Sequence, residues 1–264
     1  MSVPSLCQVV DLDAHPLHDD GYRAQCRATL DRDGALVLSG FLLPAAVRQL
    51  VAEAESLQHL AFHSEQTHTV YLETADQSYP QNDARSREVA STKGAVTADL
   101  VPDESALRTF YDDPVFRSML CDVLGEDELF EYADPLSSIN VNYFLAGQEL
   151  GWHFDNSSFA VTLLVQAPGA GGTFEYIDAM RSAERGEHNE QGVAAVLDGR
   201  PDRPPVALDQ RAGDLALFRG RDALHRVTPV VGDRTRILVV LAYNTEPGLS
   251  LSEHARMTFF GRLG

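Results

Sequence analysis

The chain has 264 residues, of which 39 are Asp or Glu and 21 are Lys or Arg, so its formal net charge is −18. This acidic balance repels nucleic-acid phosphates and anionic lipid surfaces, so neither is expected as a partner. It would attract a cationic substrate, although solubility is the ordinary reason for such a charge. No run of about 18 apolar residues is present, which argues against a transmembrane helix.

The compartment is expected to be the cytoplasm. The first ten residues lack the basic start and apolar stretch of a signal peptide. The three cysteines, Cys7, Cys26 and Cys121, are scattered and odd in number. That pattern argues against a disulfide framework or a cysteine zinc site.

Residues 1–130 predict a mostly helical N-terminal support. A short apolar run at 34–38, between turn residues, predicts one strand. Pro44 begins a helix that extends to about Leu60, because apolar residues recur there at helical spacing. Residues 102–124 predict two further helices whose apolar faces would pack on a sheet.

The polar segment 63–99 predicts an irregular loop. A loop of this length inside a compact domain is often a lid or a binding loop. Arg85, Arg87 and Lys93 lie on it and could meet a substrate carboxylate. An exposed basic patch is the more ordinary explanation of these three residues.

The pattern changes near residue 138, where short apolar segments begin to alternate with Gly and Pro turns. Such segments predict short strands and a sandwich or jelly roll. No repeat or linker divides the chain. We therefore expect one domain, 1–264, that is mainly β with supporting helices, with a double-stranded β-helix (jelly roll, cupin-like) core at 131–264.

The candidate metal ligands begin with His153 and Asp155, in Gly-Trp-His-Phe-Asp-Asn. In an extended strand, residues two apart project from the same face, so the imidazole and the carboxylate can point at one metal ion. His225 lies 70 residues beyond Asp155 and is the third candidate. Two imidazoles and one carboxylate, with the other positions open, are typical of non-haem Fe(II) oxygenases.

Two arginines follow the third candidate ligand. A metal with three free positions has room for a bidentate 2-oxo acid, whose far carboxylate needs a partner. An arginine suits this role because its guanidinium donates two parallel charged hydrogen bonds. Arg234 and Arg236 share one face of an extended strand, so one of them is expected to point toward the metal.

These motifs together resemble the Fe(II)/2-oxoglutarate-dependent dioxygenase superfamily. They are Tyr143-x-x-Gly-x-x-Leu-x-x-His153-x-Asp155, then Gly171-Gly172, Gly213-Asp214-Leu-Ala-Leu-Phe218, and His225-x-Val-x-Pro with Arg234 and Arg236. The resemblance covers about 138–246 and implies Fe(II) as the cofactor, with 2-oxoglutarate and O₂ as co-substrates. It implies His153, Asp155 and His225 as catalytic iron ligands, and Arg236 or Arg234 as the partner of 2-oxoglutarate. It also places Tyr143 facing the co-substrate, and we favour Arg236 because the apolar strand begins directly after it.

Within the superfamily, three stretches resemble the carrier-free amino-acid halogenases and their hydroxylase relatives: Trp152–Ser157, Leu217–Arg221 and Leu241–Gly248. The halogenases carry a small residue at the carboxylate position, where this chain has Asp155. The resemblance therefore implies hydroxylation of an unactivated C–H in a small molecule, with release of succinate and CO₂.

The substrate is expected to be a free amino acid, possibly a basic one. Asn156, Asn244 and Trp152 are candidate pocket residues, and Asp134 or Glu149 could meet a cationic side chain. Two other functions stay open. One is desaturation or cyclisation by the same oxidant, and the other is a cupin-like metal- or ligand-binding module without redox turnover. Nothing in the sequence indicates an oligomeric state.

Overall fold

The computed structural model describes residues 3–264. Its helices are α1 (Leu6–Val9), α2 (Asp20–Asp33), α3 (Pro44–Leu57), α4 (Ala106–Tyr111), α5 (Pro114–Leu124), α6 (Glu190–Leu197) and α7 (Glu253–Phe260), with 3₁₀ turns η1 (Gln58–Leu60) and η2 (Ala98–Leu100). Its strands are β1 (Ala35–Leu38), β2 (Phe62–His68), β3 (Val89–Val96), β4 (Ile139–Phe144), β5 (Leu150–His153), β6 (Ala160–Gln166), β7 (Ala170–Gly171), β8 (Phe174–Ile177), β9 (Val206–Ala207), β10 (Leu215–Phe218), β11 (Leu224–Val227), β12 (Val230–Val231) and β13 (Arg236–Leu241).

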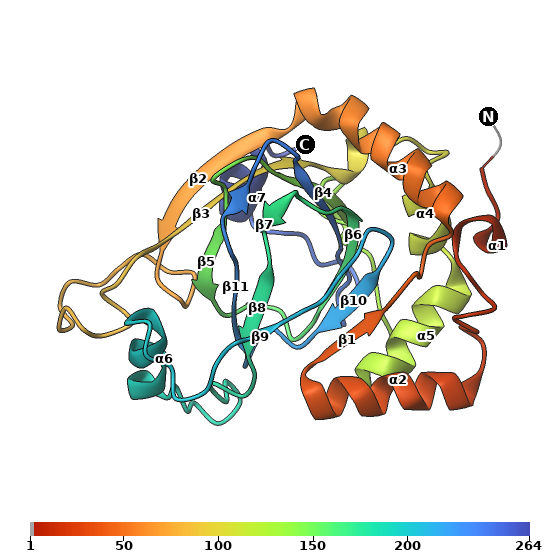
Figure 1. Ribbon diagram of the computed structural model, residues 1–264. Helices are drawn as coiled ribbons and strands as arrows, with labels where there is room; N and C mark the ends of the chain where they lie inside the picture. The colour runs from red at the N-terminus through yellow and green to blue at the C-terminus, as the bar shows by residue number, and fades with distance from the viewer. Residues whose placement is uncertain (1–2) are drawn as a thin grey trace.

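One antiparallel sheet of eleven strands curls around a central space (Figure 1). Its order is β1-β10-β6-β13-β4-β3-β5-β11-β8-β9, and β2 pairs with β3 at the side of this path. β7 and β12 form a separate two-stranded ribbon. Strands distant in sequence alternate across the sheet, as in a jelly roll, so the predicted fold class is confirmed.

Helices α2 to α5 cover the outer face of one side of the sheet (Figure 1). Pro44 occupies the first turn of α3, where its missing N–H costs nothing. Asp113 caps α5 by accepting hydrogen bonds from the N–H groups of Val115 and Phe116. These local signals made α3 and α5 predictable, and the apolar faces of α2 to α5 supply more than a third of the largest core cluster.

Strand alternation decides which side chains face the helices and which face the central space. On β13, Ile237, Val239 and Leu241 belong to the core beneath the helices. Arg236, one residue before Ile237, therefore points to the other side, into the curl of the sheet. On β4, paired with β13, Phe144 faces the same interior and its ring lies 5.2 Å from the Arg236 guanidinium.

The prediction of an irregular loop over 63–99 was wrong in part. β2 and β3 form a regular hairpin with seven paired positions, from Phe62 opposite Ala95 to His68 opposite Val89. β3 also pairs with β4 and β5, so it is integral to the main sheet. The first 130 residues thus supply five helices and three strands, of which the sequence analysis recognised one strand.

The C-terminal helix α7 packs against β2 and β3 (Figure 1). The Gln66 side-chain amide of β2 donates a hydrogen bond of 2.9 Å to the Thr258 carbonyl of α7. The helix therefore covers the part of the interior that lies next to this hairpin. Within residues 3–264, no helix has the length and apolar character needed to cross a membrane.

Candidate metal centre and co-substrate cavity

His153 is the last residue of β5, and His225 lies directly opposite it on β11. Paired residues on neighbouring antiparallel strands project from the same face. The two imidazole centroids are accordingly 4.2 Å apart, inside the curl of the sheet. Residues 72 positions apart in the chain are thus brought together by the pairing of two short strands.

Both imidazoles are held by the same kind of hydrogen bond. Nδ1 of His153 lies 2.7 Å from the Gly151 carbonyl, and Nδ1 of His225 lies 2.9 Å from the Ala223 carbonyl. Because a carbonyl only accepts, each Nδ1 must carry the proton and donate it. Nε2 of each ring is then the free lone pair, and a carbonyl partner on Nδ1 is the usual support of a metal-binding histidine.

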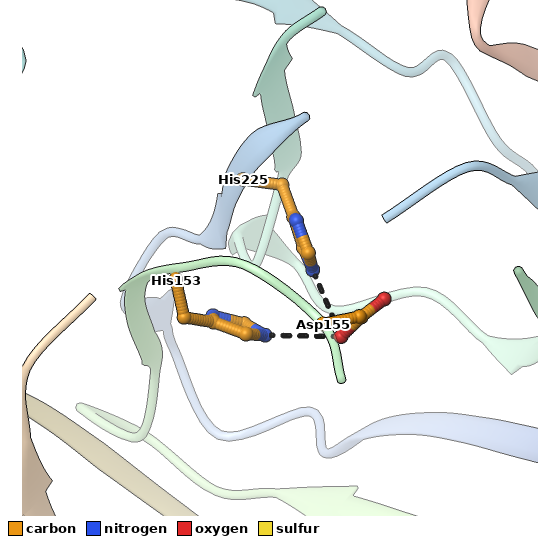
Figure 2. Close-up of side chains that lie close together, drawn as sticks. All are labelled: His153, Asp155 and His225. Carbon is orange, nitrogen blue, oxygen red and sulfur yellow. Dashed lines mark ion pairs between the residues drawn. The ribbon is translucent and has the colours of Figure 1, made fainter. Parts of the chain in front are cut away.

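Asp155 completes the cluster just beyond the end of β5. Figure 2 shows its carboxylate facing both imidazoles, with Oδ1 at 3.7 Å from Nε2 of His153 and 3.4 Å from Nε2 of His225. The three potential ligand atoms all lie within 4.8 Å of one another. Backbone bonds hold the segment, since the Phe154 N–H donates to Val70 and the Asp155 N–H donates to Gly220.

The protonation states of this cluster suit a cation. Burial, together with the neighbouring His225, lowers the pKa of the His153 imidazole to about 3, so the ring is neutral at pH 7. Burial alone would raise the pKa of the Asp155 carboxyl, but His225, His153 and Arg181 together bring it below its ordinary value. Two neutral nitrogens and one anionic oxygen are the donor set expected for Fe(II) with open positions.

Gly220 makes the space that the Asp155 carboxylate occupies. A Cβ built on Gly220 would overlap Asp155 Oδ2 and lie 2.6 Å from Cγ, closer than side chains approach one another. Any larger residue would therefore push the carboxylate from its place between the two imidazoles. The sequence analysis included Gly220 in a stretch that resembles the halogenase group but gave it no role.

Arg236 lies buried inside the curl of the sheet, with 2% of its surface exposed. No carboxylate of the described residues lies within 4.0 Å of its guanidinium nitrogens, and Nη1 has no hydrogen-bond partner. Burial lowers the pKa of Arg236 to about 10, so it stays charged at neutral pH. Apart from the Phe144 ring, this charge is uncompensated, and an uncompensated buried charge is costly.

A cavity of about 280 Å³ adjoins Arg236, and none of the three candidate ligands lines it. Phe174 lines this cavity and also stacks on His225, with ring centroids 5.5 Å apart. Gly172, at φ +59°, borders it where a Cβ would come within 3.0 Å of Arg236 Cδ. The wall of this cavity thus touches the metal cluster through Phe174, and Arg236 offers a buried cation to an anion bound in it.

Arg234, the alternative to Arg236, is exposed. Although both share strand parity, Arg234 precedes β13, in the bend after β12. It does not line the cavity that Arg236 lines. The geometry supports Arg236 as the partner of a co-substrate carboxylate.

The expectation that Tyr143 faces the co-substrate was wrong. Tyr143 is fully buried among the residues beneath the helices, and its hydroxyl donates a 2.7 Å hydrogen bond to the Ala54 carbonyl of α3. Its neighbour Phe144 faces the interior instead. A displacement of one residue along a strand moves a side chain to the opposite face.

Of the three candidate substrate residues, one lines a cavity next to the metal cluster and two do not. Asn156 follows Asp155 and lines a larger cavity on the metal side. Trp152 lies on the opposite face of β5, in a separate apolar cluster, with the Arg226 guanidinium 4.6 Å from its ring. Asn244 bridges to the Phe130 backbone and does not border that cavity. Trp152 and Asn244 are therefore structural, because alternation and backbone pairing turn them away.

Comparison with known proteins supports this assignment of the fold. A 2OG-Fe(II) oxygenase family oxidoreductase from Burkholderia pseudomallei is 17% identical, with a TM-score of 0.52 over 88% of this chain and 95% of that one. A prolyl-4-hydroxylase from Pseudomonas putida is 15% identical, with a TM-score of 0.52 over 83% and 96%. The carbocyclase SnoK from nogalamycin biosynthesis is 12% identical, with a TM-score of 0.56 over 88% and 89%.

At identities this low, the structural similarity shows a shared fold only. Membership of a family has to be shown by the sequence. No curated protein matches the chain. The sequence pattern of one family, described as HalD: Halogenase D, matches residues 18–258, which is nearly the whole chain. The protein therefore belongs to the Halogenase D family.

Proposed function

We propose that the protein is an Fe(II)- and 2-oxoglutarate-dependent oxygenase that hydroxylates an unactivated C–H of a small molecule, and that the small molecule is a free amino acid. One observation carries the proposal. The side chains of His153, Asp155 and His225 converge, and the unpaired cation Arg236 lines a cavity whose wall residue Phe174 stacks on His225. No other role explains both the convergent ligand atoms and the uncompensated buried charge.

The roles of the residues follow from their positions. His153, Asp155 and His225 would hold the iron, which supplies activation of O₂ coupled to decarboxylation of 2-oxoglutarate to succinate. Arg236 would bind the far carboxylate of 2-oxoglutarate through paired charged hydrogen bonds. Phe174 and Phe218 enclose His225 and keep water from that side of the site.

Hydroxylation is favoured over the halogenation that the family name suggests. A halide would need a coordination position and the space beside it, and here the Asp155 carboxylate occupies that space. Gly220 is shaped to receive this carboxylate, which indicates that the acidic ligand is built into the fold. The product expected is therefore an alcohol.

The test is turnover with Fe(II), 2-oxoglutarate and a panel of free amino acids, in buffers with and without chloride. We expect oxygen-dependent succinate release and a product heavier by one oxygen, independent of chloride. The His225→Gln variant should lose at least about 10³-fold in rate, as is usual when a catalytic ligand is removed. Folding of that variant is checked by circular dichroism.

Other outcomes would identify other functions. A product lighter by two hydrogens would show desaturation or ring formation, and a halogenated product would overturn the argument from Asp155. Metal binding without any consumption of 2-oxoglutarate, with or without an added amino acid, would indicate a binding module and would refute the oxygenase proposal.

A further inference from the structure

A second cavity, of about 480 Å³, lies on the open side of the metal cluster and beneath α7. His153, Asp155 and Asn156 form one wall, and β2, β3 and α7 form the others. Its volume suits a small substrate. The cavity is distinct from the one at Arg236, so a substrate and 2-oxoglutarate would approach the metal ligands from different sides.

Among the residues that line this cavity, Lys93 is the one that carries an ammonium group. It lies on β3, partly buried, with Ser91 on the same strand face, and both residues line the cavity. Within the described part of the chain, Lys93 makes no ion pair and no hydrogen bond, and its nearest aromatic neighbour is Phe259, 6.0 Å away. A charge that is half withdrawn from water and lacks a partner is one that a ligand can complete.

Arg85 and Arg87, the other two cations suggested by the sequence, differ from Lys93 in this respect. Arg85 pairs with Asp83 at 2.7 Å and with Glu190 at 2.9 Å. Arg87 pairs with Asp198 at 2.7 Å. Neither lines the substrate cavity, so of the three only Lys93 is placed to meet a substrate.

The histidines of the cavity wall do not replace Lys93. His68 is engaged at both ring nitrogens, because Nδ1–H donates to the Thr69 carbonyl and Nε2 accepts from the Ser91 hydroxyl. His254 is exposed on α7, at the edge of the cavity. Lys93 therefore supplies the main positive charge of this wall at pH 7.

The cavity offers no place for a cationic side chain. Asp155 is its one acidic residue, and that carboxylate faces the two imidazoles. Asp134 is occupied by its own turn, where it accepts from Ser137 and from the N–H groups of Leu136 and Leu251. Glu149 does not line the cavity. A basic amino acid would bring a second positive charge toward Lys93 without an opposing carboxylate.

We propose that Lys93 binds a carboxylate of the substrate, and that the substrate is a small carboxylic acid without a basic side chain, such as a neutral amino acid. This inference rests on the proposed function. Ser64, Gln66 and Thr258 surround the same space and offer hydroxyl and amide groups to the rest of such a molecule. Burial lowers the pKa of Lys93 to about 8, against the pull of Asp155, so the ammonium is the main form at pH 7.

The experiment compares Lys93→Met, Lys93→Arg and Arg87→Gln with the unaltered protein. Each is assayed with free L-amino acids and with their primary amides, which keep the amino group but lack the carboxylate. We expect turnover and binding with neutral amino acids and not with the amides. Lys93→Met should raise KM for the acid by about 10- to 100-fold, the range for losing a charged hydrogen bond. Lys93→Arg should recover much of this loss, and Arg87→Gln should be unchanged.

Two further measurements separate this inference from the proposed function. Calorimetric titration of the Zn(II)-loaded protein with 2-oxoglutarate and then the amino acid measures binding without turnover, and KM for 2-oxoglutarate should stay within about twofold in Lys93→Met. Three results would overturn the role of Lys93. The protein could use acids and amides equally well, or bind no carboxylic acid of the panel. The Lys93→Met substitution could also lower the affinity for 2-oxoglutarate alone. Failure to consume 2-oxoglutarate under any condition would instead refute the proposed oxygenase.

Discussion

Replacing Arg236 by Met should raise the 2-oxoglutarate concentration for half-maximal turnover at least about 100-fold, while Arg234→Gln should change it less than about twofold. Arg236 is buried next to the co-substrate cavity, and Arg234 is exposed before the strand. Truncating one member of a buried, hydrogen-bonded charge pair costs about 2–5 kcal/mol. At about 1.4 kcal/mol for each factor of ten, the middle of that range corresponds to the expected loss.

A second readout separates loss of the carboxylate partner from general damage. Without 2-oxoglutarate, the Arg236 guanidinium has no counter-charge, so the Met variant should melt at the same temperature as the unaltered protein or higher. Adding 2-oxoglutarate with Zn(II) should then stabilise the unaltered protein and Arg234→Gln far more than the Met variant. Equal effects of the two substitutions, or the reverse order, would show that Arg236 does not bind the co-substrate.

The convergence of His153, Asp155 and His225 was predictable from sequence. Two of these residues are close in the chain, and strand pairing brings the third to them. His153 and Asp155 are two residues apart at a strand end, and their common direction follows from strand geometry. His225 is distant in sequence, but its strand pairs with β5 at His153 itself. Helices α3 and α5 were equally clear, since a proline marks the first turn of each and Asp113 caps α5.

The hairpin of β2 and β3 was missed for a reason connected with function. Its inward-facing residues, such as Gln66 and Lys93, line the substrate cavity and are polar. A strand that borders a polar cavity on one face and solvent on the other lacks the apolar alternation that predicts strands. Lys93 therefore appeared to belong to a loop, where its likeness to Arg85 and Arg87 concealed its different surroundings.

The misplacement of Tyr143 has another physical origin. β4 is buried on both faces, with the helices on one side and the interior on the other. Hydrophobic alternation then no longer distinguishes the two faces, so the register of the strand cannot be deduced from composition. Gly220 was missed because its importance lies in an absent side chain, which becomes visible only when Asp155 is placed opposite it.

Replacing Gly220 by Ala should weaken metal binding by about 10- to 100-fold, the range found when the surroundings of a metal ligand are disturbed. The added methyl group would occupy the position of Asp155 Oδ2 and displace the carboxylate from the imidazoles. Affinity for Zn(II), measured by calorimetry, reports this without turnover. Gly169→Ala is the matched control, since the nearest atom to its Cβ, the Val231 carbonyl oxygen, is 3.8 Å away.

A double-mutant cycle with Asp155→Gly tests whether Gly220 acts through the carboxylate. Asp155→Gly alone should abolish hydroxylation, because it removes the anionic ligand. In that background the alanine at 220 has no carboxylate to displace, so its further effect on metal affinity should be less than about twofold. If Gly220→Ala weakens Zn(II) binding equally with and without Asp155, the methyl group disturbs the backbone rather than the ligand. If it weakens binding in neither, the carboxylate does not depend on the space at Gly220, and the assignment of Asp155 as a ligand held in that space fails.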